Sequence, residues 1–357
     1  NAADALVTGD DNVSIGYNSL SASTGTSDCN VIGSNSGRVI SSGERNNAHG
    51  KDTFYYLTTG QYNNAFGHSA LQNLVTGSNN SAFGNEALKQ TLASNNSAFG
   101  HRALQANTTA DQNTAVGAEA LEQNTTGANN VAVGYVSLDA NTTGDNNTAV
   151  GKSSLHLNTT GSNNTAIGNM CMGSGGTTGS NNTAVGYYSL EDCTTGTVNN
   201  CIGYEAGRSL TTGSWNVAIG GESLEENSGG SGNIAIGHDA ARYYSGNYNV
   251  AIGFQSYSAT SSTGANCVAV GYKSLAANTS GPDNTGVGYE SLLTNTTGNK
   301  NLDAIRTNQL CLDVLNFSKY ILLFKFSSFK ASNKLTMEFV ELVPRTITTP
   351  FFSLRSS

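Results

Sequence analysis

The sequence predicts an all-β protein, a parallel β-solenoid (β-roll) of about 17 coils of 17 residues with an atypical C-terminal segment. A Gly that closes an "A-V-G"-like triplet occurs 17 times from Gly16 to Gly288, so the mean interval is (288 − 16)/16 = 17 residues. Each unit joins a strand-like T-A-V-G segment to an N-T-T-G turn signal. Helical repeats are excluded because their units contain about 33 residues or more.

The composition fits a repeat better than a globular core or a disordered chain. Gly occurs 42 times and Pro 3 times in 357 residues, and only 12% of the residues are charged. Disordered chains usually carry more charge or more Pro. We therefore assign residues 1–301 to a β-solenoid repeat domain and residues 302–357 to a C-terminal cap or non-repeat tail.

The unit has the consensus N-N-T-A-V-G-Y-x-S-L-x-x-N-T-T-G-S, and we number its positions from the first Asn. The fourth position is Ala in 13 of 17 copies, and the fifth is Val, Ile or Phe in 16, with His49 as the exception. Alternation along a strand sends these two positions to opposite faces. One row should fill the coil and the other should meet a second surface. Coils stacked at about 4.8 Å would give a rod of about 80 Å.

The second position predicts a ladder of stacked asparagines inside the solenoid. An amide can both donate and accept, so stacked copies can satisfy buried polar groups. Two copies carry Cys29 and Cys267 instead. The predicted ladder is Asn12, Asn46, Asn63, Asn80, Asn96, Asn113, Asn130, Asn147, Asn164, Asn182, Asn199, Asn216, Asn233, Asn249 and Asn284.

The N-T-T-G segments are expected to be outer turns. Their Gly at the sixteenth position, as in Gly127, Gly144 and Gly161, is expected to take the positive φ of a tight turn. Their asparagines form sequons, which indicate either turn chemistry or glycan acceptors on a eukaryotic secretory route. These sequon asparagines are Asn107, Asn124, Asn141, Asn158 and Asn295.

A row of tyrosines follows the repeat Gly at the seventh position. We expect the row to face outward, either as structural cover for the neighbouring coil or chain, or as an aromatic stripe for glycan or protein. His68, His101 and His238 take the same position and are expected to be solvent-exposed. The tyrosines are Tyr17, Tyr135, Tyr187, Tyr204, Tyr272 and Tyr289.

The segments "NNTAVGAEAL", "NNVAVGYVSL", "NNTAIGN" and "NVAIGGESL" resemble the head repeats of YadA-like trimeric autotransporter adhesins and similar repeats of phage and viral tail-fibre-like proteins, over about residues 10–300. The resemblance implies a left-handed β-roll, a homotrimer with one apolar row at its axis, and adhesion to a host-surface protein or glycan. It also implies an extracellular, cell-surface or virion-associated location. The longer unit and the missing heptad stalk favour the tail-fibre interpretation.

The function expected is therefore a structural or adhesive rod or fibre shaft rather than an enzyme. No HExxH, GxSxG or GK[ST] motif occurs, so no cofactor, metal or catalytic residue is predicted. The alternative is an ice-binding solenoid that uses the Thr-Thr ladder, although a length-variable turn makes a poor flat surface. The net charge of −8 predicts no nucleic-acid partner, and no apolar run is long enough for a transmembrane segment.

The cysteines and the C-terminal tail leave alternatives open. Six cysteines without regular spacing predict mostly free thiols, with an isolated disulfide as the alternative. The tail holds seven of the twelve Phe, and its Ala304-Ile305-Arg306 falls where the next "A-I-G" is due. It is either a capping unit or an appended segment without a selected fold. The cysteines are Cys29, Cys171, Cys193, Cys201, Cys267 and Cys311.

Overall fold

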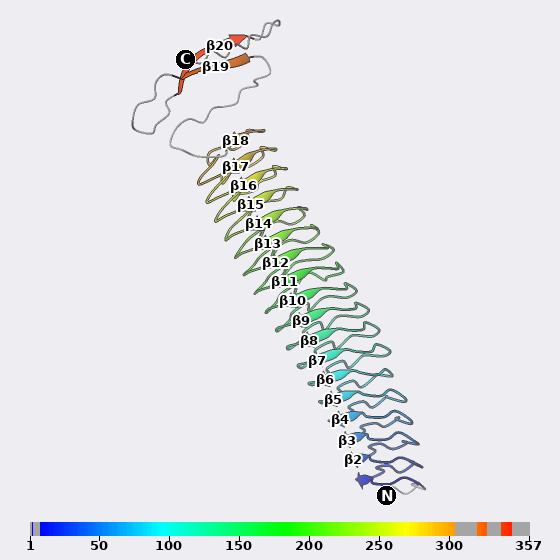
Figure 1. Cartoon of the computed structure of the whole chain (residues 1–357). Helices are drawn as coiled ribbons and strands as arrows, with labels where there is room; N and C mark the ends of the chain where they lie inside the picture. The colour runs from blue at the N-terminus through cyan, green and yellow to red at the C-terminus, as the bar shows by residue number, and fades with distance from the viewer. Residues whose placement is uncertain (1, 3–7, 304–319, 327–336, 345–357) are drawn as a thin grey trace, which may run out of the picture. The chain divides into compact units, whose positions relative to one another are not determined.

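The computed structural model describes residues 2, 8–303, 320–326 and 337–344. It divides into two units, Asn1–Thr307 and Asn308–Ser357. The first unit is a β-solenoid whose 18 strands form one parallel sheet, and its described residues contain no helix (Figure 1). The predicted fold class is confirmed.

One strand of three residues occurs in each repeat and pairs in register with the strands of the coils before and after. For example, Ala149 lies opposite Ala132 and Ala166. The strands are β1 (Val13–Ile15), β2 (Asn30–Ile32), β3 (Asn47–His49), β4 (Asn64–Phe66), β5 (Ser81–Phe83), β6 (Ser97–Phe99), β7 (Thr114–Val116), β8 (Val131–Val133), β9 (Thr148–Val150), β10 (Thr165–Ile167), β11 (Thr183–Val185), β12 (Asn200–Ile202), β13 (Val217–Ile219), β14 (Ile234–Ile236), β15 (Val250–Ile252), β16 (Val268–Val270) and β17 (Thr285–Val287).

The strands place the small residue of each unit inside. Ala149 in β9 is fully buried, whereas its neighbours Thr148 and Val150 are only half-buried. The interior is completed by the Leu of the tenth position, such as Leu155, which is also fully buried. The expected segregation of the fourth and fifth positions to opposite faces is therefore confirmed.

The S-L segment forms no second sheet, although it stacks from coil to coil. The backbone N–H of Leu155 donates to the carbonyl oxygen of Cys171 in the next coil at 2.8 Å. Ser153 and Leu155 both have φ values of +52°. Left-handed residues at alternate positions coil the backbone and prevent an extended strand.

The glycines at the sixteenth position serve a different purpose from the one predicted. Gly127 does not have a positive φ, and the same holds for Gly144 and Gly161. A Cβ on Gly127 would lie 2.3 Å from the carbonyl oxygen of Gly144, so close stacking of backbones excludes any side chain there. The positive φ belongs to the sixth position instead, where Gly151 has a φ of +132°.

A further strand extends the solenoid beyond the last full repeat. Strand β18 (Leu302–Asp303) pairs in parallel with β17. In the second unit, β19 (Tyr320–Phe326) and β20 (Met337–Pro344) form an antiparallel pair with a register shift between Leu323 and Phe324. The predicted Ala304-Ile305-Arg306 position and Cys311 lie outside the described residues.

Candidate functional surfaces

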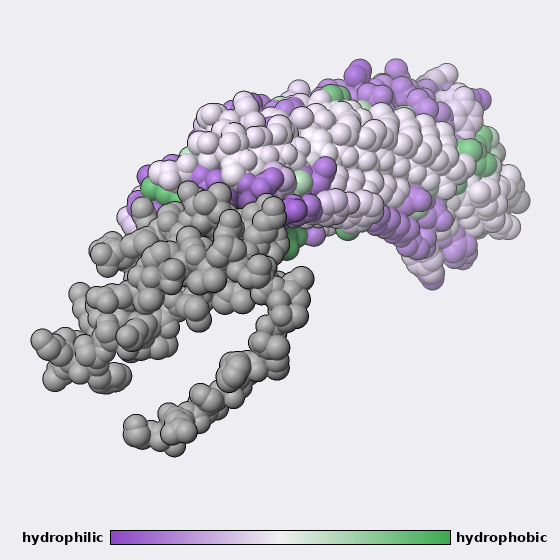
Figure 2. Space-filling view, turned by 90° about the horizontal axis from the view of Figure 1, so that it is seen from above, coloured by the Kyte–Doolittle hydropathy of each residue, from purple (hydrophilic) through white to green (hydrophobic). Residues whose placement is uncertain are grey.

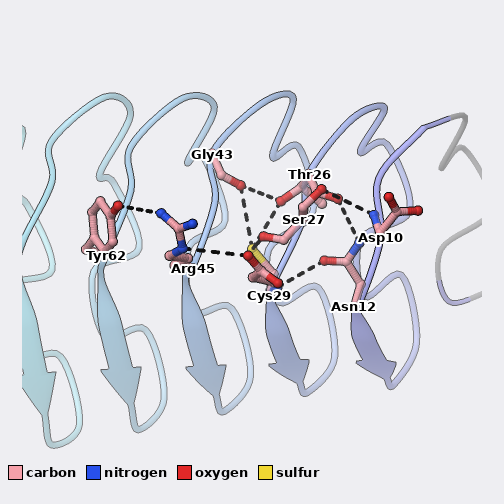
Figure 3. Close-up of polar contacts among 9 residues, drawn as sticks. Asp10, Asn12, Thr26, Ser27, Cys29, Gly43, Arg45 and Tyr62 are labelled. Atoms are coloured by element: carbon pink, nitrogen blue, oxygen red, sulfur yellow. Dashed lines mark hydrogen bonds and ion pairs between the residues drawn. The ribbon is translucent and has the colours of Figure 1, made fainter.

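The predicted asparagine ladder lies inside the solenoid and forms a hydrogen-bond chain. Asn130 Oδ1 accepts the backbone N–H of Asn147 at 2.9 Å, and Asn130 Nδ2 donates to the carbonyl oxygen of Gly144 at 2.9 Å. The same pattern begins in the first coils, where Asn12 Oδ1 accepts the backbone N–H of Cys29 at 3.0 Å (Figure 3). Every predicted member is buried except the first, Asn12, which is half-buried. The ladder is therefore a structural device of the fold.

The two cysteines in the ladder interrupt its side-chain chemistry. Cys29 Sγ donates to the carbonyl oxygen of Gly43 at 3.6 Å, in the place of an amide Nδ2 (Figure 3). Cys267 Sγ accepts the backbone N–H of Asn284 at 3.4 Å, in the place of an amide Oδ1. Sulfur is a weak donor and acceptor, so these two rungs are weaker copies of the amide rungs.

Sequence reasoning missed one rung of this ladder and a second ladder parallel to it. Asn301 donates its backbone N–H to Asn284 Oδ1 at 2.9 Å, although no repeat Gly follows it. In the second ladder, Asn124 Nδ2 donates to Asn107 Oδ1 at 3.0 Å and to the carbonyl oxygen of Gly127 at 2.9 Å.

This second ladder decides between the two interpretations of the sequons, which were turn chemistry and glycan acceptors. The side chains of Asn107, Asn124, Asn141 and Asn158 are fully buried, so they are not available for glycan in the folded chain. In each of these sequons the two Thr residues form the outer turn, while the Asn side chain points into the interior. Only Asn295, near the end of the solenoid, is partly exposed.

The predicted tyrosine row is exposed, and part of it forms a stack of rings. The centroids of Tyr187 and Tyr204 lie 5.8 Å apart, and those of Tyr272 and Tyr289 lie 5.1 Å apart. Phe254 was not predicted, but it continues the stack 5.6 Å from Tyr272. Rings that stack along the rod cover one another's faces and present their edges to solvent.

The remaining tyrosines of the row stand apart. Tyr17 and Tyr135 are 69% and 52% exposed, and within residues 8–303 neither stacks on another ring. His68, His101 and His238 are exposed as expected. Of these, His238 joins the stack through Phe254, at a centroid distance of 5.7 Å.

Charged side chains gather beside the tyrosine row in the coils of β11–β14. Arg208 Nε binds Glu191 Oε2 at 2.9 Å, and Arg242 Nε binds Glu225 Oε2 at 2.7 Å. Burial raises the pKa of Glu225 to about 6, although Arg242 acts in the opposite direction. The guanidinium groups thus offset part of the negative charge that the coils bring together.

The described cysteines are free thiols in the interior, as predicted. Cys29, Cys171, Cys193, Cys201 and Cys267 are all buried and unpaired. Burial raises the pKa of Cys171 to about 12 and that of Cys193 to about 11. A thiol with so little thiolate is a poor nucleophile and a poor metal ligand.

Residues 8–303 and the two short strands beyond them contain no group of three His, Cys, Asp or Glu placed to hold a metal ion. The same ranges contain no helix that could cross a membrane. No family model, curated protein or solved structure matches the chain.

Proposed function

We propose that the chain is a structural and adhesive rod, the shaft of a cell-surface adhesin or of a tail fibre, which acts outside the cell or on a virion. In this proposal it assembles as a homotrimer and binds a host-surface protein or glycan rather than catalysing a reaction. The resemblance of its repeats to YadA-like heads and tail-fibre arrays supports the proposal.

The observation that carries the trimer is the composition of the outer sheet face. The outward third and fifth positions of β1–β17 include no Asp, Glu, Lys or Arg. The fifth-position row stays partly exposed, as shown by Phe99 at 41%, Ile167 at 40% and Ile219 at 38%. A face of about 80 Å by about 10 Å offers about 800 Å² per chain, which is the area that a standard interface buries on each partner.

Aromatic packing strengthens this face near the N-terminal end. The rings of His49, Phe66, Phe83 and Phe99 stack at centroid distances of 4.6, 4.6 and 4.9 Å. They form a continuous aromatic ridge on the outer face of β3–β6, and three of its four rings are Phe. A ridge of this kind is typical of surfaces that become buried on association.

Sedimentation equilibrium of the full chain tests the assembly. A homotrimer has a mass of 3 × 36.9 = 110.7 kDa. The double variant Ile167→Lys, Ile219→Lys places two charges on the proposed interface and should give monomers. The matched control Thr143→Lys, Thr160→Lys changes exposed outer turns and should remain trimeric. A wild-type chain that stays monomeric at micromolar concentration would overturn the trimer.

An ice-binding solenoid is the second candidate, because exposed threonines form a regular column. Thr109, Thr126, Thr143 and Thr160 occupy the same position in four consecutive coils and are exposed. The hydroxyl group of the threonine before each of the first three is already used in a hydrogen bond within the protein. For example, Thr142 Oγ1 donates to the carbonyl oxygen of Thr159 at 2.9 Å. The first threonine of each of these pairs therefore has no free hydroxyl hydrogen to offer to ice, and the flat threonine face would have to rely on the second column. Absence of thermal hysteresis at micromolar protein would eliminate this candidate.

A further inference from the structure

The first position of the repeat changes character in a few consecutive coils. This residue precedes the ladder asparagine and has a positive φ, which suits Asn. Seven coils use Asn there: Asn79, Asn95, Asn129, Asn146, Asn163, Asn181 and Asn266. The coils of β12–β15 instead carry Val198, Trp215, Gly232 and Tyr248.

The fold does not explain this change. Trp215 and Tyr248 have φ values of +59° and +58°, which bulky side chains rarely adopt, and they are 64% and 66% exposed. Strain and exposure of large apolar surface both cost free energy. Among the described coils, Tyr62 is the single other aromatic at this position, and the flanking coils meet the same structural demand with Asn181 and Asn266. Two aromatics within three consecutive coils therefore point to a use other than folding.

The glycine between the two aromatics shapes the surface. Tyr248 Cδ1 and Cε1 lie 2.7 and 2.9 Å from the point where a Cβ of Gly232 would be. The Tyr248 ring therefore lies over the Gly232 backbone, in space that any other residue would fill. Trp215 is in the coil before Gly232, so the two aromatics are two coil spacings apart, about 10 Å.

Trp215 and Tyr248 differ from the stacked tyrosine row because no neighbouring aromatic ring of the described coils covers their ring faces. Within residues 8–303, no other ring stacks on Trp215 or Tyr248, whereas rings such as Tyr272 are covered on both sides. Two exposed aromatics spaced along one line provide contact area for flat ligand groups that follow the rod axis.

The surroundings of this aromatic pair are uncharged but polar. Residues 211–219, 228–236 and 245–252 contain no Asp, Glu, Lys or Arg. Beside the aromatics, Ser231 Oγ accepts the backbone N–H of Ser214 at 3.1 Å, and Asn247 Oδ1 accepts that of Ser231 at 2.7 Å. These hydroxyl and amide groups form a neutral polar row next to the aromatic pair.

We propose that Trp215 and Tyr248 form a platform for a neutral oligosaccharide or polysaccharide that lies along the rod. The C–H faces of pyranose rings pack on aromatic side chains, and their hydroxyl groups hydrogen-bond to Ser and Asn. A charged polymer would find no opposite charge in these three segments. The inference rests on the proposed adhesive function and names the ligand class.

Tryptophan fluorescence tests the platform directly, because Trp215 is the single Trp of the chain. The full-length chain is titrated with cellohexaose, chitohexaose and laminarihexaose. We expect at least one of them to shift the emission in a saturable way. Tyr248→Asn restores the residue common in other coils, and Gly232→Asn places a side chain where the Tyr248 ring lies. Each should weaken the affinity at least tenfold.

The matched control is Tyr62→Asn, which changes an exposed tyrosine at the same repeat position in a distant coil and should bind as the wild type does. The inference is overturned if none of the three sugars shifts the emission, or if Tyr248→Asn binds as well as Tyr62→Asn. The inference would also be overturned if polyarginine shifted the Trp215 emission and none of the sugars did, since that result would assign the platform to a protein partner. Sedimentation of the same samples reports assembly separately, so a trimer without sugar binding overturns only this inference.

Discussion

Asn63 Oδ1 accepts the backbone N–H of Asn80, one coil further along, at 3.0 Å. The same side chain donates through Nδ2 to the carbonyl oxygen of Gly77 at 2.9 Å. A single amide thus satisfies one buried donor and one buried acceptor in the interior of the rod. The same rung also forms where the interval is 16 residues, from Asn80 to Asn96, or 18 residues, from Asn164 to Asn182, so the ladder tolerates small changes in coil length.

The first prediction compares two rungs of this ladder. Asn63→Ala should destabilise its coil by about 2–4 kcal/mol, because Asn80 N–H and Gly77 C=O both lose their partners. Asn130→Ala should cost less, since Gly144 C=O keeps a hydrogen bond from Asn141 of the second ladder. Hydrogen exchange of the affected coils measures both effects.

The control for these variants is Asn79→Gly, which changes an exposed residue with a φ of +61° that Gly adopts readily. Its effect should stay within about 1 kcal/mol. Equal exchange rates in Asn63→Ala and Asn79→Gly would contradict a stabilising role for the buried amide.

The second prediction concerns the spacing of the coils. Gly151→Ala should destabilise the rod by about 3 kcal/mol or more, because the new Cβ would lie 2.3 Å from the carbonyl oxygen of Gly168 at a φ of +132°. Gly229→Ala is the matched change, since its nearest contact would be Thr212 Oγ1 at 3.4 Å. That variant should be neutral or slightly more stable in thermal unfolding. If both variants melt alike, the close approach of the backbones does not limit the sequence.

The third prediction follows from the buried carboxyl of Glu225. Its pKa is raised from the ordinary 4.5 to about 6, chiefly by burial. The folded state therefore holds a proton that the unfolded state releases, and this contribution to stability is lost as pH rises from about 4.5 through about 6. At about 1.4 kcal/mol per pKa unit, the loss amounts to about 2 kcal/mol.

The variant Glu225→Gln should remove that pH dependence, and Arg242 would keep Glu222 and Asp239 as partners. The measurement is the free energy of unfolding of both proteins between pH 4 and about pH 7. Parallel curves for the two proteins would show that this carboxyl does not titrate as described.

The fourth prediction concerns the buried thiols. A pKa of about 12 for Cys171 instead of 9.0 lowers its thiolate fraction at pH 8 by about a thousandfold. In a Cys311→Ser variant, the native chain should react with a thiol-specific chromogenic disulfide far more slowly than the chain in guanidinium chloride. Rapid reaction of all thiols in the native state would place them outside the interior.

The repeat made the solenoid, the Asn ladder and the opposite faces of the fourth and fifth positions predictable, because each depends on a residue type that recurs at one interval. The burial of the Asn124 side chain could not be predicted from the repeat in the same way. A sequon in a turn has the same letters whether its Asn faces solvent or the interior, and only the coiling of the S-L segment decides which. Gly127 was likewise identified as essential but for the wrong reason, since close stacking and positive φ both select glycine.

The candidate surfaces were harder to predict than the fold. The tyrosine row was visible because it recurs, whereas Trp215 and Tyr248 are departures from a repeat and leave no periodic signal. What could have revealed them is the contrast with Asn at the same position in other coils. Asn301 was missed for a related reason, because the Gly used to align the units is absent after it.

The asparagine ladder also gives the rod a direction. Each Oδ1 accepts from the coil that follows it and never from the one before, as Asn130 does from Asn147. The two ends of the stack are therefore chemically different, in the manner of a polar filament. A copy that continued the stack end to end would have to arrive in the same orientation, because a reversed copy would set acceptor against acceptor.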